Sequence, residues 1–101
     1  MNNILIWIQE WYKSQCNGDW EHQYGLTIDT LDNPGWSIEI DLAFTTLEKL
    51  VIDRVFVEKN ENDWFYYTVS DAQYIACGDP NKLEFLLERF KEIVDSNISQ
   101  K

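Results

Sequence analysis

Hydrophobic residues near the amino terminus recur every three or four positions. They form one broad apolar stripe, made of Ile4, Leu5, Trp7, Ile8, Trp11 and Tyr12. This spacing places them on one side of an α-helix. Either Asn3 or Asn2 can cap the first turn of that helix. We therefore expect a helix that starts directly after the capping asparagine and ends between Gln15 and Gly18.

The period of the pattern changes to two from Tyr24 onward. Apolar residues alternate with polar or small ones in two segments, at Tyr24, Leu26 and Ile28 and then at Trp36, Ile38, Ile40 and Leu42. Such alternation is typical of half-buried strands. The intervening Asp32-Asn33-Pro34-Gly35 predicts a type II turn, in which Gly35 has a positive φ. The two segments are therefore expected to form a hairpin.

Further strands and a second long helix are predicted in the rest of the chain. Two segments rich in Val, Ile, Phe and Tyr, 50–58 and 64–70, flank a polar turn, and 74–77 is a candidate short fifth strand. Asp79-Pro80 is a strong helix start, with Asp79 at the N-cap and Pro80 at the first helical position. The helix that follows has an apolar stripe made of Leu83, Leu86, Leu87, Phe90, Ile93 and Val94.

The order of these elements predicts the fold class. Strands joined by short turns form an antiparallel meander, here of four to five strands. Its apolar face needs a cover, which the N- and C-terminal helices can provide. A chain of 101 residues is the usual size of one domain. We therefore predict a single α+β domain over residues 1–101, built in two layers.

Acidic residues dominate the charge of the chain, whose formal net charge is −10. Residues 14–48 contain seven Asp or Glu side chains and no Lys or Arg. This charge repels phosphate backbones, so we expect no direct binding of nucleic acid. Two interpretations of the acidic stretch stay open at this point. It is either a solvated surface that keeps the protein soluble or a docking face for a basic partner.

Neither export nor a structural cofactor is indicated. No basic region precedes the apolar amino terminus, and Gln9 and Glu10 interrupt it, so we expect no signal peptide and no membrane span. Cys16 and Cys77 lie far apart and lack the spacing of a disulfide framework or a zinc site. We therefore expect a cytoplasmic protein without a metal or another cofactor.

Motifs that support catalysis are missing from the sequence. His22 is the only histidine, and a nucleophilic pair would have to join it to a cysteine or a serine. The chain has no Gly-rich phosphate loop and no nucleophile elbow. We therefore expect no catalytic residue. The alternative is a small enzyme or ligand-binding domain that uses His22 and nearby carboxylates, and a scaffold subunit is a third interpretation.

Five tryptophans are the most unusual feature of the composition. Trp7, Trp11 and Trp64 lie at buried positions of predicted elements, so we expect them in the core. Trp20 and Trp36 lie at a loop or strand edge among acidic residues. Partly covered aromatic rings in polar surroundings often anchor protein interfaces, although rings of this kind also pack loops. Both roles remain open for Trp20 and Trp36.

The first third of the chain is similar to a known family. Residues 7–36 read WIQEWYKSQCNGDWEHQYGLTIDTLDNPGW, which resembles the immunity protein 53 family of bacterial polymorphic-toxin systems. The likeness is closest in the strings around Trp7 to Tyr12, Gly18 to Gly25 and Leu31 to Trp36. The resemblance implies a protein that is encoded beside a toxin and neutralises it by binding, with no catalytic residues to carry over.

Charge and resemblance together predict where a partner binds. The partner is expected to be a cognate toxin, and by analogy a basic nuclease, because opposite charge speeds association. We expect it to dock on the acidic stretch between Ser14 and Glu48. The candidate contact residues are Asp19, Trp20, Glu21, His22, Asp29, Asp32, Trp36, Glu39 and Asp41.

Overall fold

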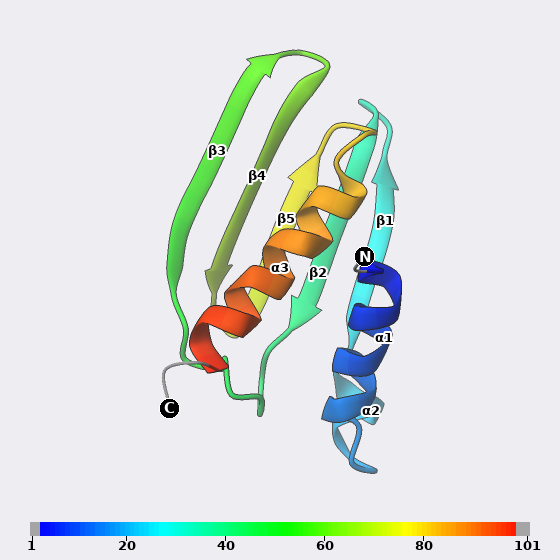
Figure 1. The fold of residues 1–101 in the computed structure, drawn as a ribbon, viewed down its shortest axis with the longest axis vertical. Coiled ribbons are helices and arrows are strands. Elements are labelled where there is room, and N and C mark those ends of the chain that lie inside the picture. The colour runs from blue at the N-terminus through cyan, green and yellow to red at the C-terminus, as the bar shows by residue number, and fades with distance from the viewer. Residues whose placement is uncertain (1–2, 99–101) are drawn as a thin grey trace.

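A computed structural model describes residues 3–98 of the chain. Its helices are α1 (Ile4–Gln15), α2 (Trp20–Gln23) and α3 (Leu83–Ile98). Its strands are β1 (Leu26–Leu31), β2 (Gly35–Asp41), β3 (Ile52–Asn60), β4 (Asp63–Ser70) and β5 (Gln73–Gly78). Figure 1 shows the strands side by side in one sheet, with α1 and α3 lying across it. The predicted α+β class is confirmed, and the candidate fifth strand is present.

The first helix begins and ends where the sequence predicts. The Asn3 side chain accepts hydrogen bonds from the amides of Leu5, at 3.0 Å, and Ile6, at 3.3 Å, so Asn3 is the N-cap. The alternative cap, Asn2, lies outside the described residues. α1 ends at Gln15. In the described part of the chain, no helix is long and apolar enough to cross a membrane.

The sheet is antiparallel throughout, with the strand order β1-β2-β5-β4-β3. It departs from a simple meander in one place, because β5 and not β3 pairs with β2. This order places the two strands with the most buried side chains, β2 and β5, inside the sheet, and it leaves the charged strand β3 at an edge. Residues 42–51 carry the chain to that edge and bury Leu42 and Leu47 on the way.

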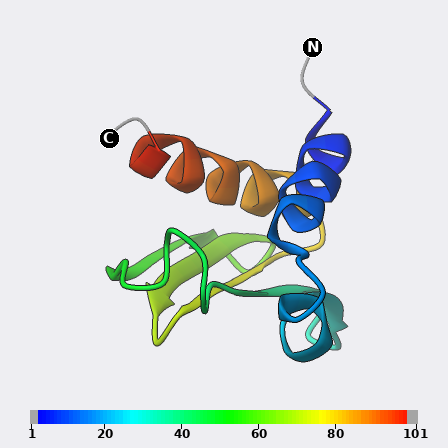
Figure 2. The ribbon, with the colours of Figure 1, turned by 90° about the horizontal axis from the view of Figure 1, so that it is seen from below.

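One face of the sheet forms the core with the two long helices. Ile38 and Ile40 of β2 pair with Ala76 and Tyr74 of β5, and all four side chains are fully buried. The Tyr74 hydroxyl donates a 2.8 Å hydrogen bond to the carbonyl of Leu86 in α3. Burial raises the pKa of Tyr74. Figure 2 shows α1 and α3 on the same side of the sheet, so the two-layer arrangement is as expected.

The turn before β2 differs from the prediction. The Asn33-Pro34 peptide bond is cis, and Gly35 lies outside the positive-φ region that a type II turn requires. Glycine is needed at this position for a different reason. A Cβ on Gly35 would lie 2.4 Å from the carbonyl oxygen of Gly78 on the neighbouring strand. The predicted positive φ is therefore wrong, and close approach of the backbones explains the glycine.

The start of the last helix also differs from the prediction. α3 begins at Leu83, so Asp79 is not its N-cap. The Asp79 carboxylate is fully buried and accepts hydrogen bonds from the amides of Trp64, at 2.9 Å, and Asn81, at 2.8 Å. The ammonium of Lys82 lies 2.6 Å from it. Asp79 faces inward because it joins the end of β5 to the start of β4.

Candidate partner-binding surface

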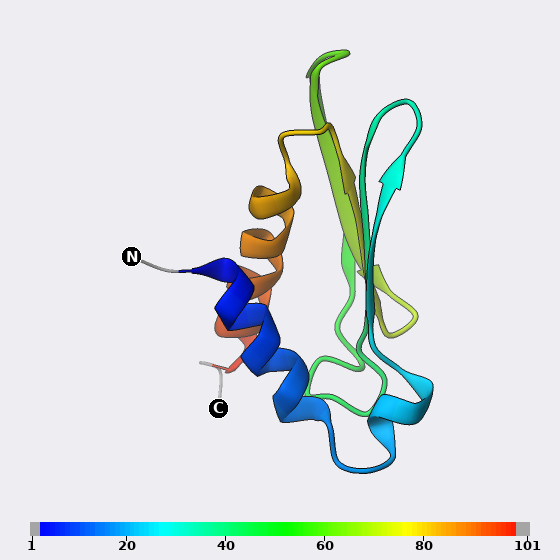
Figure 3. The same ribbon diagram turned by 90° about the vertical axis from the view of Figure 1, so that its right-hand side faces the viewer.

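The nine predicted contact residues lie in three separate places. One group, at residues 19–22, belongs to α2 and the residue before it. A second group, made of Asp29, Glu39 and Asp41, lies on the sheet face opposite the helices, which we call the open sheet face. Figure 3 shows this face without a covering helix along the strands of the described chain. Asp32 and Trp36 lie at the far end of the β1–β2 hairpin.

Trp20 is a core residue. Its side chain is 4% exposed, and its indole N–H donates a 2.8 Å hydrogen bond to the carbonyl of Ala43. Its ring also meets that of Trp11 edge to face, with centroids 6.3 Å apart. The sequence did not predict α2, and this single helical turn directs the ring inward. The expectation of a partly covered ring at a loop edge is therefore wrong for Trp20.

The polar residues around α2 have different tasks. The carboxylate of Glu21 accepts hydrogen bonds from the amides of Asn17, at 2.9 Å, and Gly18, at 2.8 Å, and so closes the loop before the helix. Hydrogen bonds from backbone amides, first its own and then those two, lower the pKa of Glu21. Asp19 and His22 are exposed. In this group, Asp19 and His22 are therefore the side chains best placed to meet a partner.

The cavity beside α2 does not favour the enzyme alternative. It has a volume of about 280 Å³ and is lined by Asn17, Asp19, Trp20, Gln23, Tyr24 and Phe44. Neither His22 nor Cys16 lines it. Among residues 3–98, no cluster of three His, Cys, Asp or Glu side chains is arranged to hold a metal ion. The structure therefore does not bring His22, a thiol and carboxylates together around this cavity.

The open sheet face carries two exposed carboxylates of the acidic stretch 14–48. Asp29 pairs with Ser37 and Glu39 pairs with Thr27, so the two acids are diagonal neighbours on this face. Both are exposed. Asp41 is less exposed, and its carboxylate accepts hydrogen bonds from the amide of Gly25 and the side chain of Gln73. Asp29 and Glu39 therefore form the acidic part of the open sheet face that faces solvent.

The opposite half of the open sheet face is aromatic, which the sequence analysis missed. The Arg54 guanidinium lies 4.7 Å from the ring centroid of Tyr66 and 5.4 Å from that of Phe56, whose side chain is 52% exposed. A hydrogen bond with Cys77 raises the pKa of Tyr66. The pairing of β3 with β4 puts Phe56 opposite Tyr66 and so places both rings on one face, and this pairing cannot be read from the sequence alone. The face is thus acidic on β1 and β2 and aromatic on β3 and β4.

The remaining two predicted residues do not join the open sheet face. Asp32 is exposed in the hairpin turn. Trp36 pairs with Gly78 and has the same orientation as Ile38, so it lies on the helix side of the sheet. Its ring is half-buried, and its indole N–H donates to the carbonyl of Pro80 at 2.9 Å. Trp36 therefore does not lie beside Glu39.

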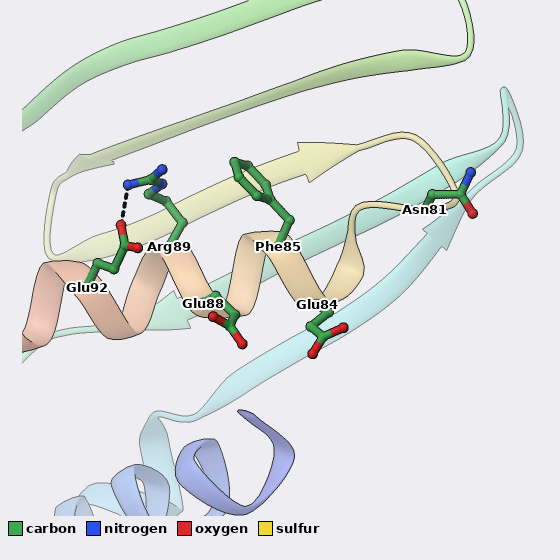
Figure 4. A pocket seen from close by; sticks show the side chains of 6 residues that line it. All are labelled: Asn81, Glu84, Phe85, Glu88, Arg89 and Glu92. Atoms are coloured by element: carbon green, nitrogen blue, oxygen red, sulfur yellow. Dashed lines mark hydrogen bonds and ion pairs between the residues drawn. The ribbon is translucent and has the colours of Figure 1, made fainter. Parts of the chain in front are cut away.

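A further cavity, along α3, has mixed charge. It has a volume of about 340 Å³ and is lined by Asn81, Glu84, Phe85, Glu88, Arg89 and Glu92. Figure 4 shows Arg89 paired with Glu92 on the helix surface, while Glu84 and Glu88 project in another direction. The guanidinium of Arg89 also lies 5.5 Å from the ring centroid of Phe85. This arrangement is typical of a charged helix surface, and it does not hold a converging acid-base pair.

Comparison with known proteins identifies the family. The family model described as immunity protein 53 matches residues 5–95, which is most of the chain. The match extends well beyond the first third, where the sequence resemblance is closest. No curated protein and no solved structure matches the chain.

Proposed function

Since the chain belongs to the immunity protein 53 family, we propose that it protects the producing cell by binding and neutralising a cognate bacterial toxin. It acts in the cytoplasm, by occupying a surface of the toxin and not by catalysis. The partner is a protein with a basic binding surface. By analogy, that partner is a nuclease whose basic surface normally holds phosphates.

The exposed carboxylates of the open sheet face carry this proposal. Asp29 and Glu39 are diagonal neighbours there, on strands from a stretch of 35 residues, 14–48, that has no Lys or Arg. Their charge is therefore not neutralised by neighbours along the chain. The pairing of β1 with β2 fixes the backbone positions of these two residues, and a pre-formed backbone loses little entropy when it binds.

Electrostatic attraction gives such an inhibitor its speed. Complementary charge raises association rate constants from about 10⁵–10⁶ M⁻¹s⁻¹ toward 10⁸–10⁹ M⁻¹s⁻¹ at low salt. An immunity protein needs this speed because it must capture the toxin before damage occurs. The same negative charge repels nucleic acid, so the inhibitor itself does not bind the nucleic acid on which such a toxin would act.

Co-expression in bacteria with the product of the adjacent reading frame tests this function. We expect that product to stop growth alone and the intact chain to restore growth. The double variant Asp29→Lys with Glu39→Lys should lose protection. The control, Glu61→Lys with Glu84→Lys, makes the same charge change at two exposed acids away from the open sheet face, and it should still protect. Equal protection by both variants would place the binding surface elsewhere.

A further inference from the structure

The two outer strands of the sheet differ in how well their edges are protected. The register of β3 is irregular in two places, and the strand carries the charged side chains Asp53, Arg54, Glu58 and Lys59. Bulges and charges of this kind keep other strands from pairing with an edge. β1 instead pairs with β2 in unbroken register over all six residues, and Asp29 is its only charged residue.

The backbone of β1 has hydrogen-bonding groups available at its outer edge. The amide of Asp41 donates to the carbonyl of Gly25 at 2.9 Å, which fixes the alternation of the ladder. In an antiparallel pair every second residue then directs its amide and carbonyl away from the partner strand. In β1 these residues are Leu26, Ile28 and Thr30. The Thr30 amide is held by the Asp29 carboxylate at 2.8 Å, so this carboxylate lies at the outer edge.

An apolar groove runs beside the same edge. Its volume is about 330 Å³, and it is lined by Ile8, Gln9, Tyr12, Gly25 and Leu26 from α1 and the start of β1. Ile28 lies on the same side of β1 as Leu26, because it pairs with Ile38 and faces the helix layer. Its side chain is 38% exposed. Tyr12 is 39% exposed. A strand placed along β1 would therefore cover apolar side chains that are now partly in solvent.

We propose that β1 binds an extended segment of the toxin as a sixth strand of the sheet. This inference rests on the proposed function, and it specifies how the partner docks. Side chains alternate along a strand. The segment would therefore direct apolar residues into the groove beside Ile8 and Leu26, and basic residues toward Asp29 and the open sheet face. Backbone hydrogen bonds supply affinity in this mode of recognition, and the alternate side chains supply specificity.

Amide hydrogen exchange tests this mode of docking directly. The chain is measured alone and bound to the product of the adjacent reading frame. We expect the amides of Leu26 and Ile28 to exchange at least about tenfold more slowly in the complex, because they gain hydrogen-bond partners. A complex in which both amides exchange at their unbound rates would overturn the inference while leaving the proposed function intact. No binding by the intact chain would contradict both.

A pair of matched substitutions provides a second readout. Ile28→Lys places a charge on the inner side of the β1 edge, and Val51→Lys places the same charge directly before the opposite edge strand, β3, at another exposed apolar side chain. We expect Ile28→Lys to speed dissociation at least about tenfold and Val51→Lys to change it less than about twofold, with both variants folded as judged by thermal melting. Equal dissociation rates for the two variants would contradict docking at β1.

Discussion

Replacement of Asp79 by asparagine tests whether the buried carboxylate holds the end of the sheet to the start of α3. Asp79 is fully buried, and its two oxygens accept three hydrogen bonds, from Trp64, Asn81 and Lys82. Asparagine has nearly the same shape but offers one oxygen and one NH2 group. Whichever way the amide is turned, its NH2 group must face at least one of these three donors.

The size of the loss follows from these contacts. A hydrogen bond to a charged group contributes about 1.5–3 kcal/mol, and the substitution removes at least one such bond and the charge that strengthens the others. Lys82 is not left alone, because it retains Asp63 at 2.8 Å. We therefore expect Asp79→Asn to lower the free energy of unfolding by about 2–3 kcal/mol. For a domain of this size, that corresponds to a fall in Tm of roughly 10–20 °C.

Urea denaturation and thermal melting measure this loss, with Asp63→Asn as the control. Asp63 binds the same ammonium, but its side chain is 45% exposed, so the control should lose less than about 1 kcal/mol. A loss below 1 kcal/mol for Asp79→Asn, or equal losses for the two variants, would refute the structural role given to Asp79.

Three further predictions concern stability. Gly35→Ala should lower the free energy of unfolding by about 1–3 kcal/mol in urea, because its Cβ would meet the Gly78 carbonyl; a neutral result would contradict this close approach. Trp20→Ala should lower it by about 3–5 kcal/mol, because the ring is buried and hydrogen-bonded to Ala43; a loss under 1 kcal/mol would contradict its place in the core. Burial would raise the pKa of Asp79, but its hydrogen bonds outweigh burial and lower it. The ionised carboxylate therefore stabilises the fold above about pH 4, and this contribution should be lost as pH falls below that value, less so in Asp79→Asn. Denaturation curves between pH 2 and 6, a range of about two units around that value, measure the difference, and identical acid dependence would contradict the prediction.

Local patterns were sufficient to predict the two long helices and the strands of this fold, but not α2. The three-to-four spacing from Ile4 onward and the N-cap at Asn3 identify α1, and the alternation around Ile38 identifies β2. Both signals depend on neighbours in sequence and on which side of an element is buried. They say nothing of which strand lies beside which. The pairing of β2 with β5 was therefore missed, because it depends on the total burial of strands far apart in the chain.

The surface was predicted less well than the fold, for a similar reason. The acidic stretch was visible in the sequence, but the sequence did not show which of its acids face solvent. The strand pairing leaves Asp29 and Glu39 exposed, whereas the Asp41 carboxylate accepts hydrogen bonds from Gly25 and Gln73. The Asp79-Pro80 pair has the composition of a helix start, but the Asp79 carboxylate accepts a hydrogen bond from the amide of Trp64 in β4 and does not cap α3.

Trp20 shows the same limit. An indole among acids looks solvent-facing in sequence, and only the short turn of α2 directs it into the core. The contact between the rings of Trp20 and Trp11 of α1 is a tertiary contact, and local sequence spacing does not encode it.

The rate of toxin association as a function of salt tests the central claim most directly. Glu39→Lys and Glu84→Lys each change the charge of the chain by the same amount, at exposed positions on opposite sides of the sheet. If the acidic part of the open sheet face steers the toxin, Glu39→Lys should slow association on the order of tenfold at low salt and flatten its salt dependence. Glu84→Lys should change the rate less than about twofold. Equal slowing by both would show that only net charge matters, and wild-type rates for Glu39→Lys would contradict binding through the open sheet face.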